Sequence, residues 1–244
     1  MKIGYVKFLL ICFCFFLLNK LNAQIKLYSD TTNESLKLKT AKNFYKQELG
    51  ENEFIYTGTE YFGYESNITG TAFLGSEEMK PSDIYYDGNL YENILMLYDL
   101  VRQEIVINRF NKIYKIKLLN EKLKWFTFNG RHFENIEDNK DDASSQSIYE
   151  VLNNGIAMAL IKHSKRIVQG LKPEDPPRFS EDDTYFIRSN NRSYPIKSIN
   201  NVLNALKDKK DVVRDFIKTN NFDFKKNIEK ELEITATYYS TLVK

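Results

Sequence analysis

The feature that most constrains this chain is a change in the period of its hydrophobic residues near the C-terminus. From Phe54 onward, aromatic and β-branched runs alternate with short turn segments, a pattern typical of antiparallel sheet. After Lys197 the apolar residues recur every three to four positions, as on one face of a helix. The sequence therefore predicts an α+β fold: an antiparallel β-meander, either a sheet or a half-barrel, with a C-terminal helical segment packed on it.

The clearest hairpin signal is Asn129-Gly130, a two-residue turn of the I′ kind between two aromatic runs. It pairs Phe126 with Phe133 and Thr127 with His132, and places Trp125, Thr127, His132 and Glu134 on one face. Further hairpins are predicted around Asp87-Gly88-Asn89, Asn153-Asn154-Gly155 and 189–192, and further strands at 94–100, 104–108, 114–119 and 122–128.

Three helices are expected after Lys197. Ser198 can cap the first and Asp223 can cap the third, which is predicted over 224–243. The second begins near Asp211 and ends at Asn220-Asn221. The residues expected to face the core are Ile199, Val202, Leu203 and Leu206 in the first helix, Val212, Val213, Phe216 and Ile217 in the second, and Ile228, Leu232, Thr235 and Tyr239 in the third.

The expected division of the chain is a signal peptide at 1–23, a β-rich region at 24–177, and a β-hairpin with C-terminal helices at 178–244. A short helix is predicted at 40–49, and the segment 173–177, which holds three prolines, is predicted to be a stiff linker. Because neither of the two later regions is clearly self-sufficient, we expect them to form one domain.

The first residues have the three-part layout of a secretory signal peptide. Lys2 and Lys7 precede eleven apolar residues at 8–18, and a polar segment follows that ends in Ala23. A membrane anchor is the alternative, but eleven residues at about 1.5 Å each cover only about half of a roughly 30 Å hydrocarbon core. We therefore expect cleavage near Ala23, a mature chain from Gln24 without a transmembrane span, and a location in the periplasm, on the cell surface or outside the cell.

Cleavage would change both the thiol content and the charge. Cys12 and Cys14 lie inside the apolar stretch, so the mature chain would be free of cysteine, with no disulfide or thiolate chemistry. Residues 1–23 hold three lysines and no acid, so their removal takes 35 basic residues to 32, against 33 acidic ones. The basic excess of the full chain disappears, and no electrostatic argument remains for a nucleic-acid partner.

Several segments carry a family resemblance. The runs 56–61, 84–88, 97–99 and 149–155, and the late Tyr238-Tyr239, combine tyrosines with turn residues. With the leader ending in Asn22-Ala23-Gln24, they resemble uncharacterised exported proteins of Bacteroidetes-type bacteria. The resemblance implies an aromatic meander with a helical tail and an exported location; it implies no activity.

Only two histidines are present, and each raises a possible site. His132 and Glu134 on a common face could be two metal ligands or an acid–base pair, but a metal needs about three or four ligands and no third is identifiable. His163 lies in the basic run 162–166, which could meet a phosphate or an anionic sugar. For His132 we favour a place on a half-exposed hairpin face over a metal or acid–base site. For His163 we favour a solvated strand end over an anion-binding site.

The acidic residues raise two further hypotheses. Calcium could bind weakly to the carboxylates at 134–142 (Glu134, Glu137, Asp138, Asp141, Asp142), but the central glycine and distal glutamate of a calcium loop are missing, so a solvated loop is favoured. The run Glu181-Asp182-Asp183 is similar and weaker. A carboxylate pair for glycoside hydrolysis could come from distant strands, but no local pattern selects one.

The expected mature chain is rich in aromatic residues, which could stack on sugars, form a protein interface or fill the core. We favour the hypothesis that most aromatic residues fill the core. The candidates for an exposed aromatic cluster are Tyr85, Tyr86, Tyr91, Tyr98 and Trp125. The sequence thus favours an exported protein with a non-enzymatic binding or structural role in the cell envelope and an envelope protein or glycan as partner. The alternatives are an envelope hydrolase acting on glycan and a carrier of an apolar ligand. No catalytic, cofactor-binding or metal-ligating residue and no cofactor is assigned.

Overall fold

The computed structural model describes residues 54–109, 113–137, 146–170, 172 and 174–243, together with Lys37 and Thr40. Phe54–Lys244 forms one compact unit. The predicted signal peptide at 1–23, the predicted helix at 40–49 apart from Thr40, and the acidic residues at 138–145 lie outside the described residues.

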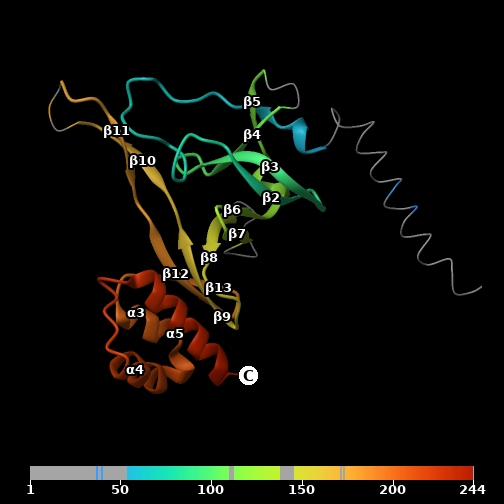
Figure 1. Ribbon diagram of the computed structural model, residues 1–244. Helices are drawn as coiled ribbons and strands as arrows, with labels where there is room; N and C mark the ends of the chain where they lie inside the picture. Colours follow the sequence, from blue (N-terminus) through green and yellow to red (C-terminus); the bar gives the residue numbers. More distant parts are fainter. Residues whose placement is uncertain are drawn as a thin grey trace, which may run out of the picture. The chain divides into compact units, whose positions relative to one another are not determined.

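Eleven antiparallel strands form one sheet, and two more strands form a separate ribbon (Figure 1). In spatial order the sheet consists of β1 (Thr59–Glu60), β5 (Lys115–Lys117), β4 (Glu104–Asn108), β3 (Asn89–Asp99), β2 (Lys80–Tyr86), β6 (Leu123–Phe128), β7 (Arg131–Glu137), β8 (Gln146–Val151), β9 (Ala157–Lys162), β12 (Thr184–Ser189) and β13 (Arg192–Ile196). The ribbon pairs β10 (Lys165–Val168) with β11 (Arg178–Glu181), and two 3-10 turns, η1 (Phe54–Thr57) and η2 (Asn120–Lys122), lie beside β1 and β6 in the sequence.

Two-residue turns with positive φ angles join the strands that the sequence paired. Asn129 and Gly130 have φ of 52° and 75°, and the register of β6 and β7 matches Phe126 with Phe133 and Thr127 with His132, as predicted. The turn between β2 and β3 is Asp87-Gly88, with φ of 49° and 78°. The β12–β13 hairpin is tighter than predicted, because Ser189 pairs with Arg192 and leaves two residues in the turn.

The helices gather beside β9, β12 and β13, which confirms the predicted α+β class (Figure 1). They are α3 (Ile199–Ala205), α4 (Lys210–Thr219) and α5 (Ile228–Leu242), with the 3-10 turn η4 (Lys207–Lys209) between the first two. Within the described residues, no helix combines the length and the apolar character that a membrane crossing requires.

Several details of the helix prediction are wrong. Ile199 was expected in the core but is 37% exposed at the start of α3. Ser198 precedes α3 as predicted, but its hydroxyl donates to Asn201 Oδ1 and makes no capping hydrogen bond.

Val212 was expected in the core but is 45% exposed, because Val213 and Ile217 are the residues of α4 that face inward. The last helix begins at Ile228 rather than at residue 224, since Phe224 to Lys226 form a turn in which the N–H of Lys226 bonds to the carbonyl of Asp223. Leu232, Thr235 and Tyr239 of the predicted stripe are buried, as expected.

The predicted linker at 173–177 falls in the connection between two antiparallel neighbours, β10 and β11. The chain turns back on itself so closely that a Cβ placed on Gly170 would lie 2.3 Å from the Cβ of Asp175. A proline-rich segment therefore connects the two strands of the ribbon.

Both large cores lie on one face of the sheet, which we call the inner face. Cross-strand partners share a face, and the partners Phe133–Glu150, Glu150–Ile161 and Ile161–Tyr185 connect β7 to β12 along it. The core over β2–β8 contains Ile84, Met96, Tyr98, Phe126 and Phe133. The core between β9, β12 and the helices contains Ala157, Ala159, Ile187, Leu206, Leu232 and Tyr239.

Gly155 marks a close approach between the β8–β9 connection and α5. A Cβ on Gly155 would lie 2.4 Å from Ser240 Oγ, which accepts a hydrogen bond from the N–H of Ala157 at 3.2 Å. Gly155→Ala should lower the free energy of unfolding by about 1–3 kcal/mol, the usual cost of overpacking, in urea titrations. The matched control is Gly63→Ala, where nothing lies within 4 Å and the change should be neutral or slightly stabilising. Equal effects of the two substitutions would contradict this account.

Candidate functional site

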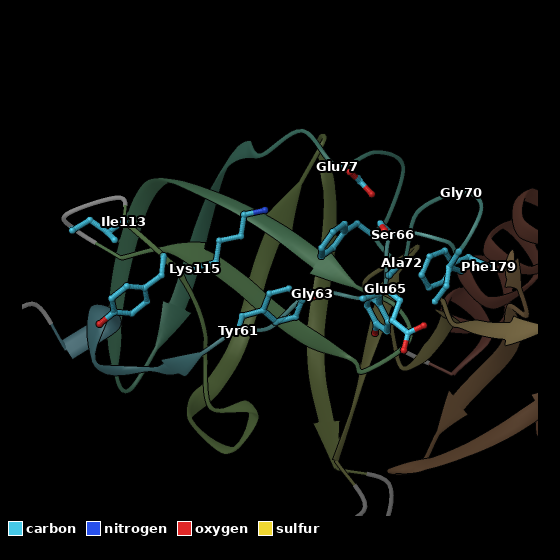
Figure 2. Close-up of a pocket in the computed structure, with 14 residues that line it drawn as sticks. Tyr61, Gly63, Glu65, Ser66, Gly70, Ala72, Glu77, Ile113, Lys115 and Phe179 are labelled. Atoms are coloured by element: carbon cyan, nitrogen blue, oxygen red, sulfur yellow. The ribbon is translucent and has the colours of Figure 1, made fainter. Parts of the chain in front are cut away.

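A cleft of about 690 Å³ lies on the outer face, the face opposite the two large cores, where the segment after β1 crosses the sheet. Its lining comes from that segment, from the start of β5 and from β11 (Figure 2). Aromatic rings make up much of the surface: Tyr61, Tyr64, Phe73, Tyr114 and Phe179. The polar or charged side chains that line it are Glu65, Ser66, Glu77 and Lys115.

A fully buried carboxylate holds the segment that forms one wall. Asp99, at the end of β3, has no exposed surface and accepts hydrogen bonds from the hydroxyl groups of Tyr61 (2.8 Å) and Tyr64 (3.0 Å). The backbone N–H groups of Val101 and Arg102 donate to its other oxygen at 2.9 and 3.0 Å. Because buried carboxylates are costly unless hydrogen-bonded, this set fixes both tyrosines in place.

The two tyrosine hydroxyls remain protonated donors. Burial raises the pKa of Tyr61 far above its ordinary value, and the hydrogen bond to Asp99 raises it further. Burial and the charge of Asp99 raise the pKa of Tyr64 in the same way. Neither hydroxyl is therefore suited to act as a base or a nucleophile, and both serve to orient their rings.

Cations cover parts of the aromatic surface. The guanidinium of Arg102 lies 4.3 Å from the ring centroid of Tyr64 and 5.3 Å from that of Tyr61, and its Nη1 donates to the carbonyl of Phe62. Lys115 Nζ lies 6.0 Å from the ring centroid of Phe73. The edge-to-face pair of Tyr64 and Phe179, with centroids 5.2 Å apart, joins the segment after β1 to β11.

The cleft is elongated and open. Figure 2 shows Ile113 at one end and Phe179 at the other, with Lys115 and Tyr61 between them. Tyr61 and Phe73 are buried and form a rigid floor, whereas Glu65, Ser66 and Glu77 are exposed at the rim. An apolar floor with an acidic and basic rim can hold a ligand that has both flat apolar faces and hydroxyl groups.

A second group of charged side chains lies on the inner face, between the two cores. His163, directly after β9, contacts Glu150 Oε2 through Nε2 at 2.7 Å and Asp183 Oδ2 through Nδ1 at 2.7 Å. Arg131 makes a two-point contact with Glu150, with Nε 2.7 Å from Oε1 and Nη2 against Oε2. We call these four residues the ionic cluster.

The partners shift the pKa values of the cluster strongly. Burial alone would lower the pKa of His163, but the hydrogen bonds with Asp183 and Glu150 outweigh burial and raise it to about 9. Burial alone would raise the pKa of Glu150, but Arg131 and His163 lower it to about 2. His163 and Glu150 are therefore both charged at neutral pH.

The geometry of the cluster favours a structural role over chemistry. The side chains of His163 and Glu150 are only 7% and 9% exposed. The two carboxylates bind opposite ring nitrogens, so the three groups share no point at which an ion could be held. Over the described residues, no three His, Cys, Asp or Glu side chains are placed to bind a metal.

The predicted solvated strand end at 162–166 is wrong, and so is the idea of a free anion-binding run. Lys162 donates to Ser147 Oγ, and Lys165, whose side chain is 7% exposed, donates to the carbonyls of Thr71 and Phe73. Arg166 lies 3.7 Å from Asp182, and Asp183 binds His163. The acidic run at 181–183 thus supplies partners for the basic run instead of a calcium site.

The other candidates have mixed outcomes. His132 Nε2 and Glu134 Oε1 lie 3.1 Å apart on a half-exposed face, as predicted. Glu137 is exposed at the end of β7, and Asp138, Asp141 and Asp142 lie outside the described residues. Tyr86, Tyr91 and Tyr98 are buried in the core, whereas Tyr85 and Trp125 remain half-exposed.

Comparison of the chain with protein-family models, with curated proteins and with solved structures finds no match.

Sequence reasoning missed Asp99 and the rings around it. The signal was weak but present: Tyr61 and Tyr64 flank Gly63 in a segment without strand periodicity, and Asp99 follows the apolar run of β3 directly. A carboxylate at that point, where a strand ends, commonly bonds to backbone N–H groups of the following turn.

Proposed function

We propose that this chain is an exported protein with a non-enzymatic binding role in the cell envelope, and that the cleft binds a linear glycan. The observation that supports this most is an elongated, open cleft with a rigid aromatic floor and a polar rim. The apolar C–H faces of pyranose rings pack on aromatic rings, and their hydroxyl groups need hydrogen-bond partners at the rim.

The alternatives have less support. The carboxylates that line the cleft, Glu65 and Glu77, are exposed, and the strongly shifted carboxylate Glu150 is paired with Arg131 on the inner face. For a carrier, the inner face would need space, but Ile84, Met96, Tyr98, Phe126 and Phe133 fill it with 0% exposure each. Neither hydrolysis nor enclosure of an apolar molecule follows from these arrangements.

Binding should be measured by titration calorimetry with hexasaccharides of N-acetylglucosamine, glucose and mannose, and with soluble glycan strands of bacterial cell wall. Phe179→Ala and Tyr114→Ala should each weaken binding about tenfold, because each removes an aromatic ring from the lining of the cleft. The matched control is Phe62→Ala, since Phe62 is 71% exposed and lies outside the lining.

Two results would count against the proposal. If none of these glycans binds at millimolar concentration, the cleft is not a glycan site. If reducing ends appear when the protein is incubated with a bound glycan, the role is enzymatic and the hydrolase alternative replaces it.

A further inference from the structure

The segment that forms one wall of the cleft has little regular secondary structure. It runs from Tyr61 to Leu74, contains only two isolated β-bridges, and is called the wall below. Its apolar support on the outer face is a small core, made of Tyr61, Phe73, Leu97 and Val106. Because a segment without a strand or helix does not satisfy its own backbone groups, the wall depends on polar partners from other elements.

One of these partners is a buried ammonium group. Lys165, the first residue of β10, donates from Nζ to the carbonyls of Thr71 at 3.0 Å and Phe73 at 2.9 Å. Its side chain is 7% exposed, and the closest approach to a carboxylate is 3.6 Å, to Glu181, which is itself 73% exposed. The two carbonyls of the wall are therefore the buried partners that offset the cost of placing a charge there.

The ribbon that carries Lys165 also supplies part of the cleft. Its strands form a ladder separate from the main sheet, and Phe179 of β11 lines the cleft. The N–H of Phe179 donates to the carbonyl of Thr69 at 3.0 Å, and the N–H of Thr69 donates to the carbonyl of Pro177 at 2.8 Å. Figure 2 shows Gly70 of the wall at the same end of the cleft as Phe179. The placement of the ribbon against the wall thus determines the shape of this end.

Lys165 connects the wall and the ribbon to the sheet at one point. Besides its two bonds to the wall, its backbone N–H donates to the carbonyl of Leu100 at 3.0 Å, directly after β3. The N–H of Leu100 in turn donates to the carbonyl of Ala72 at 2.9 Å. Lys165 does not line the cleft, so it can act on a ligand only through the residues that it holds.

We propose that Lys165 is a positioning residue for the cleft: its ammonium group fixes the wall against the ribbon and so keeps the cleft in the shape that binds. Loss of this group would leave two buried carbonyls without a donor and allow the wall to move. A binding surface that must be ordered by its ligand binds more weakly than one already in place. The effect on affinity rests on the proposed glycan-binding function, whereas the effect on the wall can be measured without a ligand.

Lys165→Met tests the proposal, because methionine keeps an unbranched apolar stem and removes the ammonium group. Hydrogen–deuterium exchange should become faster at the wall, above all at the N–H groups of Thr69 and Leu74, which bond to Pro177 and Tyr98. The affinity for the glycan that the unmodified protein binds should fall about tenfold in calorimetry.

Gly155→Ala is the matched control. It is expected to destabilise the fold by crowding Ser240 of α5, and Gly155 does not line the cleft. This variant should leave both the exchange at the wall and the affinity unchanged. If Lys165→Met does not fold, Lys165→Arg replaces it. Arginine keeps the charge but displaces the donors, so exchange at the wall should rise and affinity should fall by a smaller factor.

The possible results separate this inference from the function on which it rests. Exchange and affinity that stay at the level of the unmodified protein would overturn the role of Lys165. So would an equal rise in exchange at the wall in Gly155→Ala, which would mark a general loss of stability, or faster exchange at the wall with unchanged affinity. Faster exchange confined to the wall, in a protein that binds none of the glycans tested, would support the role of Lys165 and reject the glycan function alone.

Discussion

Replacement of His163 by alanine should lower the free energy of unfolding by about 3–5 kcal/mol, the usual cost of removing one partner from a buried ion pair. The imidazolium lies between Glu150 and Asp183, at 2.7 Å from each. Without it, Glu150 keeps its contact with Arg131, whereas among the described residues Asp183 keeps the N–H of Ser164 at 3.3 Å as its one hydrogen-bond donor. The free energy should be measured by equilibrium unfolding in urea at pH 6.

The other histidine of the chain provides the matched control. The side chain of His132 is 38% exposed, and its polar contact within the described part of the chain is with Glu134 at 3.1 Å. Exposed pairs contribute little, so His132→Ala should change the free energy by about 0.5 kcal/mol or less. A loss below about 1 kcal/mol for His163→Ala, or equal losses for both variants, would show that the ionic cluster does not hold the fold together.

The same histidine should make the stability of the protein depend on pH in the alkaline range. Its pKa is about 9 in the folded state against 6.5 for an ordinary histidine. A raised pKa means that the folded state binds the proton more tightly, so the stabilisation is complete below pH 6.5 and is lost as the pH rises through 9. The loss should amount to about 3 kcal/mol.

At acid pH the dependence of stability on pH has the opposite sign, because the pKa of Glu150 is lowered in the folded state. The pKa of Glu150 is about 2 in the folded state against 4.5 ordinarily, so its contribution is present above pH 4.5 and is lost as the pH falls through 2. Stability should therefore be highest between about pH 4.5 and 6.5.

Urea titrations at intervals from pH 5 to 10 test the alkaline decline, and His163→Ala should flatten most of it. The His163 resonance, identified as the one that persists in His132→Ala, should titrate near 9, and titration of that resonance near 6.5 would refute the assignment.

Local features of the fold could be predicted because short-range chemistry determines them. Asn129-Gly130 fits a turn that needs two positive φ angles, and that turn alone sets the register of β6 and β7. The switch to a helical period after Lys197 likewise depends only on neighbours in the sequence. From these signals the sequence predicts the antiparallel meander and the C-terminal helices.

Features that depend on partners far apart in the sequence could not be predicted. His163 was expected at a solvated strand end because its neighbours 162–166 are basic, and nothing local reveals that Glu150 and Asp183 enclose it. The proline-rich segment reads as a linker, but the pairing of the two strands that it connects, β10 and β11, is visible only in three dimensions.

The cleft combines residues from three separated segments. Tyr64 meets Asp99 thirty-five positions later, and it meets Phe179 on a strand that was not predicted at all. The aromatic excess of the sequence did indicate stacking as one use of these rings. Which rings remain accessible depends on the face of each strand, and Tyr85 and Tyr86 show how adjacent residues take opposite roles.

The order of the strands also bears on how the chain reaches this fold. Within β2–β5 and within β6–β9, each strand pairs with its neighbour in sequence, so both blocks consist of hairpins that can form independently. The blocks meet where β6 pairs with β2, and Ile84 lies opposite Phe126 there. That contact closes a loop of some forty residues, at an entropic cost that no single hairpin has to meet. Pairing of β2 with β6 is thus a late, non-local step in the assembly of the sheet. The residues that β2 and β6 bring into contact govern the rate of this step.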